Sequence, residues 1–208
     1  GLSAHLVENF QGRFENLVVL FPHRRPRRYL LDRLAADARL PKPCLLPRVL
    51  SIGELFAELA GRLLDAPPRT LTELDRVGVL HKVVLGLGSG LRGPDNALPR
   101  EVRDFFPWGL GLASLLEELF QQGVTAANLD HVQDMVMPTA AALLGSLKNN
   151  QQAYREALLS RGAATPGLLS ALVADRAEEA TALLAGRTVL ACGFHALTGS
   201  EEALFKAL

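Results

Sequence analysis

Two short apolar runs, one near each end of the chain, restrict the fold more than any other feature of the sequence. Residues 16–21 read Asn-Leu-Val-Val-Leu-Phe and stop at Pro22, and residues 188–193 read Thr-Val-Leu-Ala-Cys-Gly. A short run that is apolar at nearly every position is typical of a strand buried on both faces of a parallel sheet. We therefore expect each run to form one buried strand of an α/β fold.

Helical and extended segments follow the first run. Apolar residues, Tyr29 among them, recur at helical spacing from Arg27 to Ala38, so a helix is expected there. Residues 44–50 have an extended pattern, but Pro47 restricts them to an edge strand or an irregular segment, because proline has no N–H to donate to a sheet. Strand, helix and strand in this order are the components of a parallel sheet.

Two capping boxes predict where the next helices begin. Ser51 and Glu54 have the S-x-x-E spacing in which each side chain bonds the backbone of the other, so we expect a helix over residues 53–64. Thr70 and Glu73 repeat this spacing ahead of a second helical pattern. Each of the two helices is therefore expected to begin within a few residues of its capping box.

Residues 100–184 contain almost nothing that resembles a strand. Helical patterns cover about 101–122, 126–160 and 166–184. Beyond the second apolar run, Thr198 and Glu201 form another capping box and predict one more helix.

This order of elements predicts a parallel-sheet domain that is interrupted by helices. We expect residues 1–72 and 186–208 to form an incomplete α/β domain, and residues 73–185 to form a large all-helical insertion. The chain begins with Gly and ends within a helical pattern, so we expect it to be part of a longer protein.

The overall composition points to no particular partner. Arg and Lys together number 22, as do Asp and Glu, so the whole chain gives no electrostatic reason to bind nucleic acid or a membrane. No run of about 18 apolar residues and no signal-peptide pattern occurs, which favours a cytoplasmic protein without membrane contact. Cys44 and Cys192 lie in separate apolar segments and are interpreted as free core thiols.

Motifs for nucleotide or nuclease chemistry are missing. None of the lysines follows a glycine, so the phosphate-binding G-x-x-x-x-G-K-[ST] loop does not occur, and none has an acidic residue two positions earlier, as PD-(D/E)XK nucleases require. Gly88 to Gly93 match G-x-G-x-x-G, but they follow a helix and are interpreted as a loop. Asp130, His131 and Asp134 are interpreted as solvated helix surface. We therefore expect no cofactor and no metal in this chain.

A cluster of arginines is the most informative local signal. Arg24, Arg25, Arg27 and Arg28 lie between the first strand and its helix, where ligands dock on α/β sheets, and residues 23–48 carry a formal charge of +6. Arginine is suited to phosphate, and cations at a helix N-terminus are unfavourable unless an anion compensates them. The cluster is a candidate DNA-backbone site, while ion pairs with the acidic segment 95–134, of charge −5, and a solvated surface remain alternatives.

Three aromatic residues are a second candidate for contact with DNA. Phe105, Phe106 and Trp108 could stack on bases, but aromatic residues that begin a helix in an apolar block are more often core.

Four segments resemble the N-terminal, helicase-like region of AddB-type subunits of bacterial recombination helicase-nucleases and their relatives in the PD-(D/E)XK nuclease superfamily. The first, residues 16–30, is similar to a strand and arginine-rich turn that is the counterpart of helicase motif Ia, which touches single-stranded DNA. The others are residues 45–55, the W-G motif in 105–109, and Gly-Phe-His-Ala-Leu-Thr at 193–198. The acidic pattern associated with the W-G motif does not follow Leu116.

The resemblance implies a partial RecA-like domain, of the superfamily 1 helicase type, that has lost its nucleotide chemistry. Aligned with helicase motif II, Cys192 and Gly193 occupy the positions of the two acids that handle Mg²⁺. The family's nuclease domain would lie beyond residue 208, and the full-length protein would be an exonuclease that works without ATP or with a partner subunit.

The expected function is non-catalytic DNA binding and scaffolding within a double-strand-break-repair helicase-nuclease. Its expected partners are DNA, single-stranded or at a duplex end and contacted through its backbone, and the helicase-nuclease partner subunit. The alternative is an interaction scaffold whose arginines pair with its own acidic helices and which docks the partner without touching DNA. An enzyme in its own right is the third hypothesis, and turnover by this chain would support it.

Overall fold

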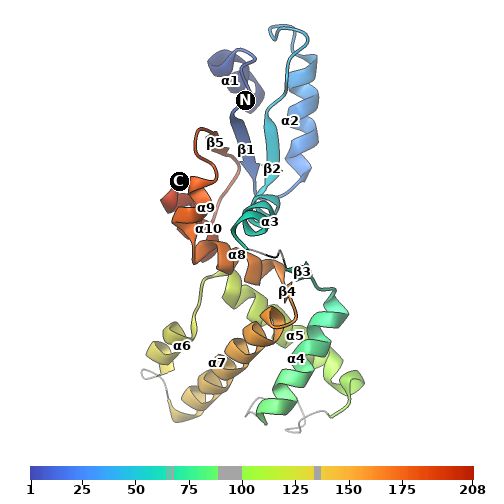
Figure 1. Ribbon diagram of the computed structural model, residues 1–208, viewed down its shortest axis with the longest axis vertical. Helices are drawn as coiled ribbons and strands as arrows, with labels where there is room; N and C mark the ends of the chain where they lie inside the picture. Colours follow the sequence, from blue (N-terminus) through green and yellow to red (C-terminus); the bar gives the residue numbers. More distant parts are fainter. Residues whose placement is uncertain (65, 67, 89–99, 134–136) are drawn as a thin grey trace.

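A three-stranded parallel sheet forms one end of the molecule. The computed structural model describes residues 1–64, 66, 68–88, 100–133 and 137–208. Strands β1 (Leu17–Phe21), β2 (Arg48–Ser51) and β5 (Thr188–Ala191) pair in the order β2-β1-β5 (Figure 1). The expected α/β class is confirmed, and the two apolar runs pair with each other in parallel as β1 and β5.

The central strand β1 divides the apolar core in two. All five of its residues are buried. Val18 and Leu20 join a large cluster that continues through the helices, whereas Leu17, Val19 and Phe21 join a smaller one with residues of the first two helices. Alternate side chains of a strand point to opposite faces, so β1 needs an apolar residue at every position.

The two edge strands are less buried than β1. Strand β2 lies at one edge, as Pro47 predicts, and residues 44–47 just before it have no regular structure. Strand β5 lies at the other edge with exposed Thr188 and Ala191, so the prediction of a second strand buried on both faces was wrong. Cys44 and Cys192 are free but only partly buried, and burial raises the pKa of the Cys192 thiol.

Helices α1 (Leu2–Phe10), α2 (Arg25–Ala36) and α3 (Ile52–Leu63) accompany the sheet. The capping box of Ser51 and Glu54 is present at the start of α3, as expected. The second expected box was wrong, because Thr70 belongs to the two-residue strand β3 (Arg69–Thr70) and Thr72 caps the next helix by accepting from the backbone N–H of Asp75.

The remaining helices are arranged below the sheet in Figure 1. They are α4 (Glu73–Leu87), α5 (Val102–Gln121), α6 (Ala126–Gln133), α7 (Pro138–Leu159), α8 (Pro166–Ala174) and α9 (Ala177–Ala182), followed beyond β5 by α10 (Gly199–Ala207). The helical stretch expected over 126–160 consists of α6 and α7, and α7 begins at Pro138. The expectation that no strand interrupts this block was also wrong, because β4 (Ala163–Ala164) pairs with β3.

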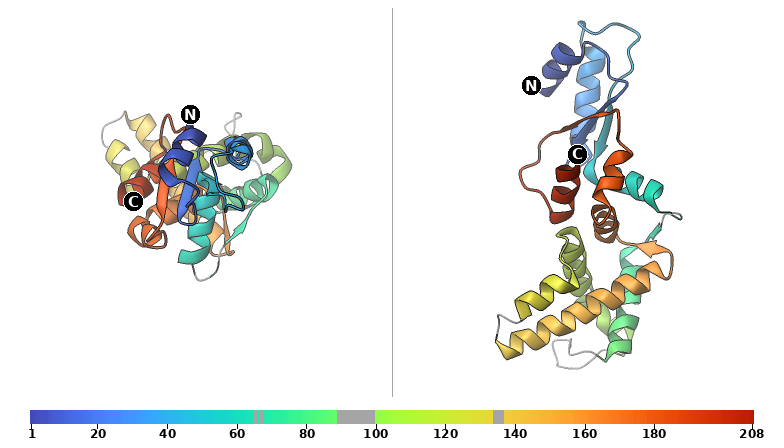
Figure 2. Two further views of the ribbon diagram at one scale, coloured as in Figure 1. Left: turned by 90° about the horizontal axis from the view of Figure 1, so that it is seen from above. Right: turned by 60° about the vertical axis from the view of Figure 1, so that its left-hand side comes forward.

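The helical part and the sheet share a continuous core. Leu55 and Leu59 of α3 lie in the same buried cluster as Leu116 of α5 and Leu168 of α8. Figure 2 shows α8, α9 and α10 between the sheet and helices α4 to α7. The division at residues 72 and 186 therefore stays a prediction.

Two glycines allow backbones to approach closely where these helices meet. A Cβ on Gly199 of α10 would lie 2.1 Å from the carbonyl oxygen of Gln122, and a Cβ on Gly167 of α8 would lie 2.6 Å from that of Glu117. Both contacts are with the C-terminal half of α5 or the residue after it. Among the described residues, no helix is long and apolar enough to cross a lipid bilayer.

Candidate nucleic-acid interface

The arginine cluster lies at the connection between β1 and α2 and in the first turn of α2. Strand β1 ends at Phe21, and Arg24 is the N-cap residue of α2. No side chain caps this helix, and its first turn carries no acidic residue. The first backbone N–H groups of α2 and the arginines therefore share one corner of the sheet, at the carboxyl ends of its strands, and both favour an anion.

One carboxylate, that of Glu54, already lies in this corner. Its Oε1 is 3.0 Å from Nε of Arg24 and 3.7 Å from Nη1 of Arg27. Its Oε2 accepts hydrogen bonds from the backbone N–H and the hydroxyl of Ser51, at 2.9 and 3.0 Å. The Ser51 backbone hydrogen bond is the largest cause that lowers the pKa of Glu54, with smaller contributions from Ser51 Oγ, Arg24 and Arg27.

The outer face of α2 is more open. Arg25 makes no side-chain hydrogen bond or ion pair with the described part of the chain, and Arg28 has an ion pair only with Asp32, at 3.6 Å. Both arginines are exposed, and the side chain of Arg28 is 89 % accessible. Arg33 is exposed on the same face, one turn further along. Arg28 and Arg33 lie three and eight positions after Arg25, so both are on the same side of the helix as Arg25.

Tyr29 lies among these arginines. The apolar pattern of the sequence includes it, but 75 % of its surface is exposed, whereas Leu30 and Leu34 face the core. The spacing of Arg25, Tyr29 and Arg33 at every fourth residue is the signal that could have placed it on the outer face. An exposed ring between cations offers a flat surface on which a base could stack.

Ion pairs reduce the positive charge predicted for residues 23–48. Arg48 forms two hydrogen bonds with the carboxylate of Glu58, and Arg39 binds Asp37 and Glu8. The bond from Arg39 is the largest cause that lowers the pKa of Asp37 to about 2. Among the described residues 23–48, the cations without an ion pair are Arg25 and Arg33 on the outer face of α2, and Lys42 beyond this helix.

Pairing of the arginines with the acidic segment 95–134, one of the alternatives, is not seen in the described residues, where the arginines form more local pairs. Arg24 and Arg27 contact Glu54, and Arg28 contacts Asp32, all outside the acidic segment. Within that segment, Glu117 accepts a hydrogen bond from the backbone N–H of Gly167 at 2.6 Å. Asp95 and Asp134 lie outside the described residues. Glu117 thus compensates the start of α8 instead of the arginine cluster.

The other sequence candidates are distributed elsewhere. Phe105 is fully buried, with its ring centroid 4.9 Å from those of His81 and Trp108, which agrees with a core role. Asp130 binds Nζ of Lys148 at 2.6 Å. Most of the G-x-G-x-x-G segment lies outside the described residues. In the described part of the chain, no three His, Cys, Asp or Glu side chains form a group that could hold a metal ion.

The two residues that directly follow β5 are not acidic. Cys192 and Gly193 follow β5, and a Cβ on Gly193 would be 4.0 Å from Cδ of Pro22, so the ends of β1 and β5 adjoin. Glu201, the first acidic residue after them, is engaged in the capping box of α10. The carboxyl ends of the three strands thus present arginines, a thiol and a capping glutamate.

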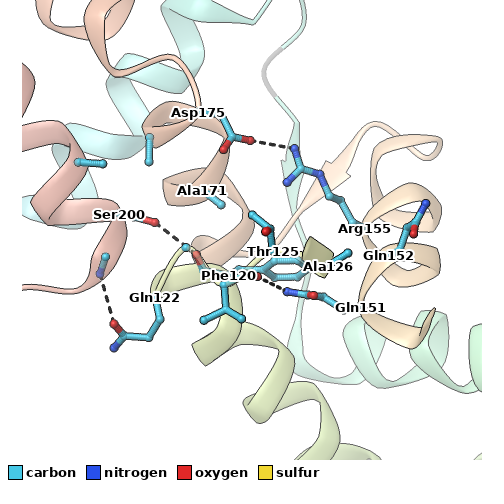
Figure 3. A pocket seen from close by; sticks show the side chains of 15 residues that line it. Phe120, Gln122, Thr125, Ala126, Gln151, Gln152, Arg155, Ala171, Asp175 and Ser200 are labelled. Atoms are coloured by element: carbon cyan, nitrogen blue, oxygen red, sulfur yellow. Dashed lines mark hydrogen bonds and ion pairs between the residues drawn. The ribbon is translucent and has the colours of Figure 1, made fainter. Parts of the chain in front are cut away.

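A cavity of about 400 Å³ lies away from the arginine cluster of α2, between the end of α5 and helices α7, α8 and α10 (Figure 3). Its polar side chains are engaged with the protein. Arg155 binds Asp175 at 3.1 Å, Gln151 donates to the carbonyl oxygen of Val124 at 2.7 Å, and Gln122 accepts from the backbone N–H of Gly199 at 3.3 Å. The cavity therefore presents mainly small apolar groups and no evident reactive centre.

Comparison with known proteins assigns no family to the chain. No protein-family model matches the sequence, and no curated protein is significantly similar to it.

Proposed function

We propose that this chain is a non-catalytic DNA-binding module that holds the phosphate backbone against the start and outer face of α2. The observation that carries the proposal is the exposed row of Arg25, Arg28 and Arg33 with Tyr29 between them. A solvated surface would be expected to alternate both signs of charge, whereas Asp32 is the only acidic residue of α2.

The proposed mechanism is electrostatic. Arginine guanidinium groups form charge-assisted, often bidentate hydrogen bonds with phosphate oxygens, and their binding releases counterions from the DNA. Tyr29 is placed to stack on an unpaired base, which favours single-stranded over duplex DNA. Neither contact reads base edges, so little sequence preference is expected.

The RecA-like relationship belongs to the same proposal. A parallel sheet with its ligand corner at the carboxyl ends of the strands is consistent with a fragment of such a domain. Residues Cys192 and Gly193, at the positions of the two Mg²⁺-handling acids, support loss of nucleotide hydrolysis. The proposed setting is an AddB-type helicase-nuclease, and the cytoplasmic location stays a prediction of the sequence.

Fluorescence anisotropy of a labelled 20-nucleotide oligothymidylate, and of a duplex of equal length, tests this proposal at 50 and 200 mM salt. Each phosphate contact on a single strand changes log K by about −0.7 per log unit of salt, so two to four contacts predict roughly a 7- to 50-fold loss of affinity. A variant with Arg24, Arg25, Arg27 and Arg28 changed to Ala should lose binding.

The matched control removes the same total charge from exposed arginines elsewhere, namely Arg13, Arg100, Arg103 and Arg161. If only net charge matters, the two quadruple variants will lose affinity for DNA equally. That result would show that the DNA-binding face is not on α2. If the wild-type chain does not bind at about 10⁻⁴ M, the weak end of non-specific affinity, the proposed function fails.

The second candidate function is a scaffold that docks a partner subunit without touching DNA. Exposed apolar side chains near the start of α7 favour it, because Met137 is 75 % and Leu143 is 58 % exposed. A chain that binds no DNA but co-elutes with a helicase-nuclease partner, and loses that association when Met137 and Leu143 become Ser, would support this function.

A further inference from the structure

The two oxygens of the Glu54 carboxylate contact different groups. Oε2 accepts the two hydrogen bonds from Ser51 that fix the start of α3, and Oε1 faces the guanidinium groups of Arg24 and Arg27. The carboxylate is held by its own helix cap and is mostly buried, with its side chain 22 % exposed. It can therefore neutralise both arginines without losing further side-chain freedom.

A phosphate oxygen approaching Arg24 or Arg27 meets this carboxylate at short range. Two anions cannot share the same guanidinium edges without strong repulsion, because the interaction grows as the distance falls. Arg25 has no such competitor among the described residues, and the competitor of Arg28, Asp32, is itself 72 % exposed and screened by solvent.

We propose that Glu54 is an internal competitor for phosphate, which restricts the DNA-binding face to Arg25, Arg28 and Arg33 and keeps Arg24 and Arg27 occupied. This inference rests on the proposed function and adds its affinity-setting residue. A moderate affinity for DNA follows, because two of the five arginines at the start and on the outer face of α2 are already neutralised by Glu54.

The test is Glu54→Gln. Glutamine retains an oxygen that can accept from Ser51, since capping boxes use Glu or Gln, and its amide NH₂ cannot neutralise an arginine. We expect oligothymidylate to bind about five-fold or more tightly at 50 mM salt. The salt slope should steepen from about −2.1 for three contacts to about −3.5 for five, because two more phosphates are neutralised.

Asp32→Asn is the matched control, because it removes one negative charge from the same patch and touches Arg28 alone. The background Arg24→Ala/Arg27→Ala is the second control, and there Glu54→Gln should have almost no effect. Circular dichroism and urea unfolding verify that all variants fold.

The outcomes separate the two proposals. Tighter binding by Glu54→Gln than by Asp32→Asn, with a steeper salt slope that disappears in the double-alanine background, supports the inference. Equal effects of the two variants, or weaker binding by Glu54→Gln, overturn it and leave the proposed function standing. Absence of binding by the wild type and by Glu54→Gln overturns both.

Discussion

Replacement of Gly199 by alanine should separate α10 from α5. The new Cβ would lie 2.1 Å from the backbone oxygen of Gln122, more than 1 Å inside ordinary contact distance. No change of side-chain rotamer can separate the two atoms, because each is fixed by the backbone. Relief of the overlap requires displacement of α10. Two hydrogen bonds hold this helix in place, from the Gly199 N–H to Gln122 Oε1 and from the hydroxyl of Ser200 to the carbonyl of Phe120, each at 3.3 Å.

The magnitude follows from these contacts. Two hydrogen bonds contribute about 2 kcal/mol, and overpacking adds roughly 1–3 kcal/mol. Alanine is favoured over glycine within helices by about 1 kcal/mol, which offsets part of the loss. We expect Gly199→Ala to lower the free energy of unfolding by about 2–4 kcal/mol, with a fall in Tm of roughly 4–16 °C for a chain of this size.

Gly111→Ala provides the matched control. Gly111 lies in α5, and a Cβ there meets nothing within 4 Å. This variant should gain up to about 1 kcal/mol from helix propensity. Urea unfolding followed by circular dichroism measures both. If Gly199→Ala is as stable as the wild type or as Gly111→Ala, the close contact between α10 and α5 is refuted.

Three further predictions concern the core, a helix start and pH. Phe105→Ala should destabilise the fold by about 3–5 kcal/mol in urea unfolding, because it empties a fully buried site beside His81. Glu117→Ala should cost about 1–2 kcal/mol by leaving the Gly167 N–H without its acceptor, and Glu117→Gln should cost less; similar stability of the two variants would contradict this. The folded-state pKa of Glu54 lies below its ordinary value of 4.5, so its stabilising contribution is present above pH 4.5 and is lost as the pH falls through the lower folded-state value. The difference in unfolding free energy between wild type and Glu54→Gln should therefore shrink in acid. A difference that does not change with pH would show that the ionised Glu54 carboxylate does not stabilise the fold.

Features encoded locally were predicted well from the sequence. The apolar run 17–21 can be satisfied only by burial on both faces, and the boxes at Ser51 and Thr198 specify helix starts through contacts three residues apart. Each of these signals needs no knowledge of the rest of the chain. The same holds for the position of the arginine cluster after β1.

Features that depend on distant partners were predicted poorly. The exposure of β5 follows from its place at the sheet edge, and strand β4 exists only because residues 69–70 lie beside it. The contact of Glu54 with Arg24 and Arg27 could have been inferred once β1 and β2 were taken as parallel neighbours, since their carboxyl ends then meet at one corner. The exposure of Tyr29 is not predicted by the apolar pattern of α2, because that pattern counts its ring with the leucines that face the core.

The pairing of β1 with β5 also sets an order of events in time. Leu17 pairs with Thr188, about 170 positions later, so one edge of the most apolar strand has no native neighbour until those intervening residues have been made. At roughly 5–20 residues per second, that interval on a ribosome is about 10–30 s. During it, β1 can complete its unit with α2, β2 and α3, but its open edge is a template for pairing with other chains. The nascent protein should therefore depend on chaperones until β5 has been synthesised and pairs with β1.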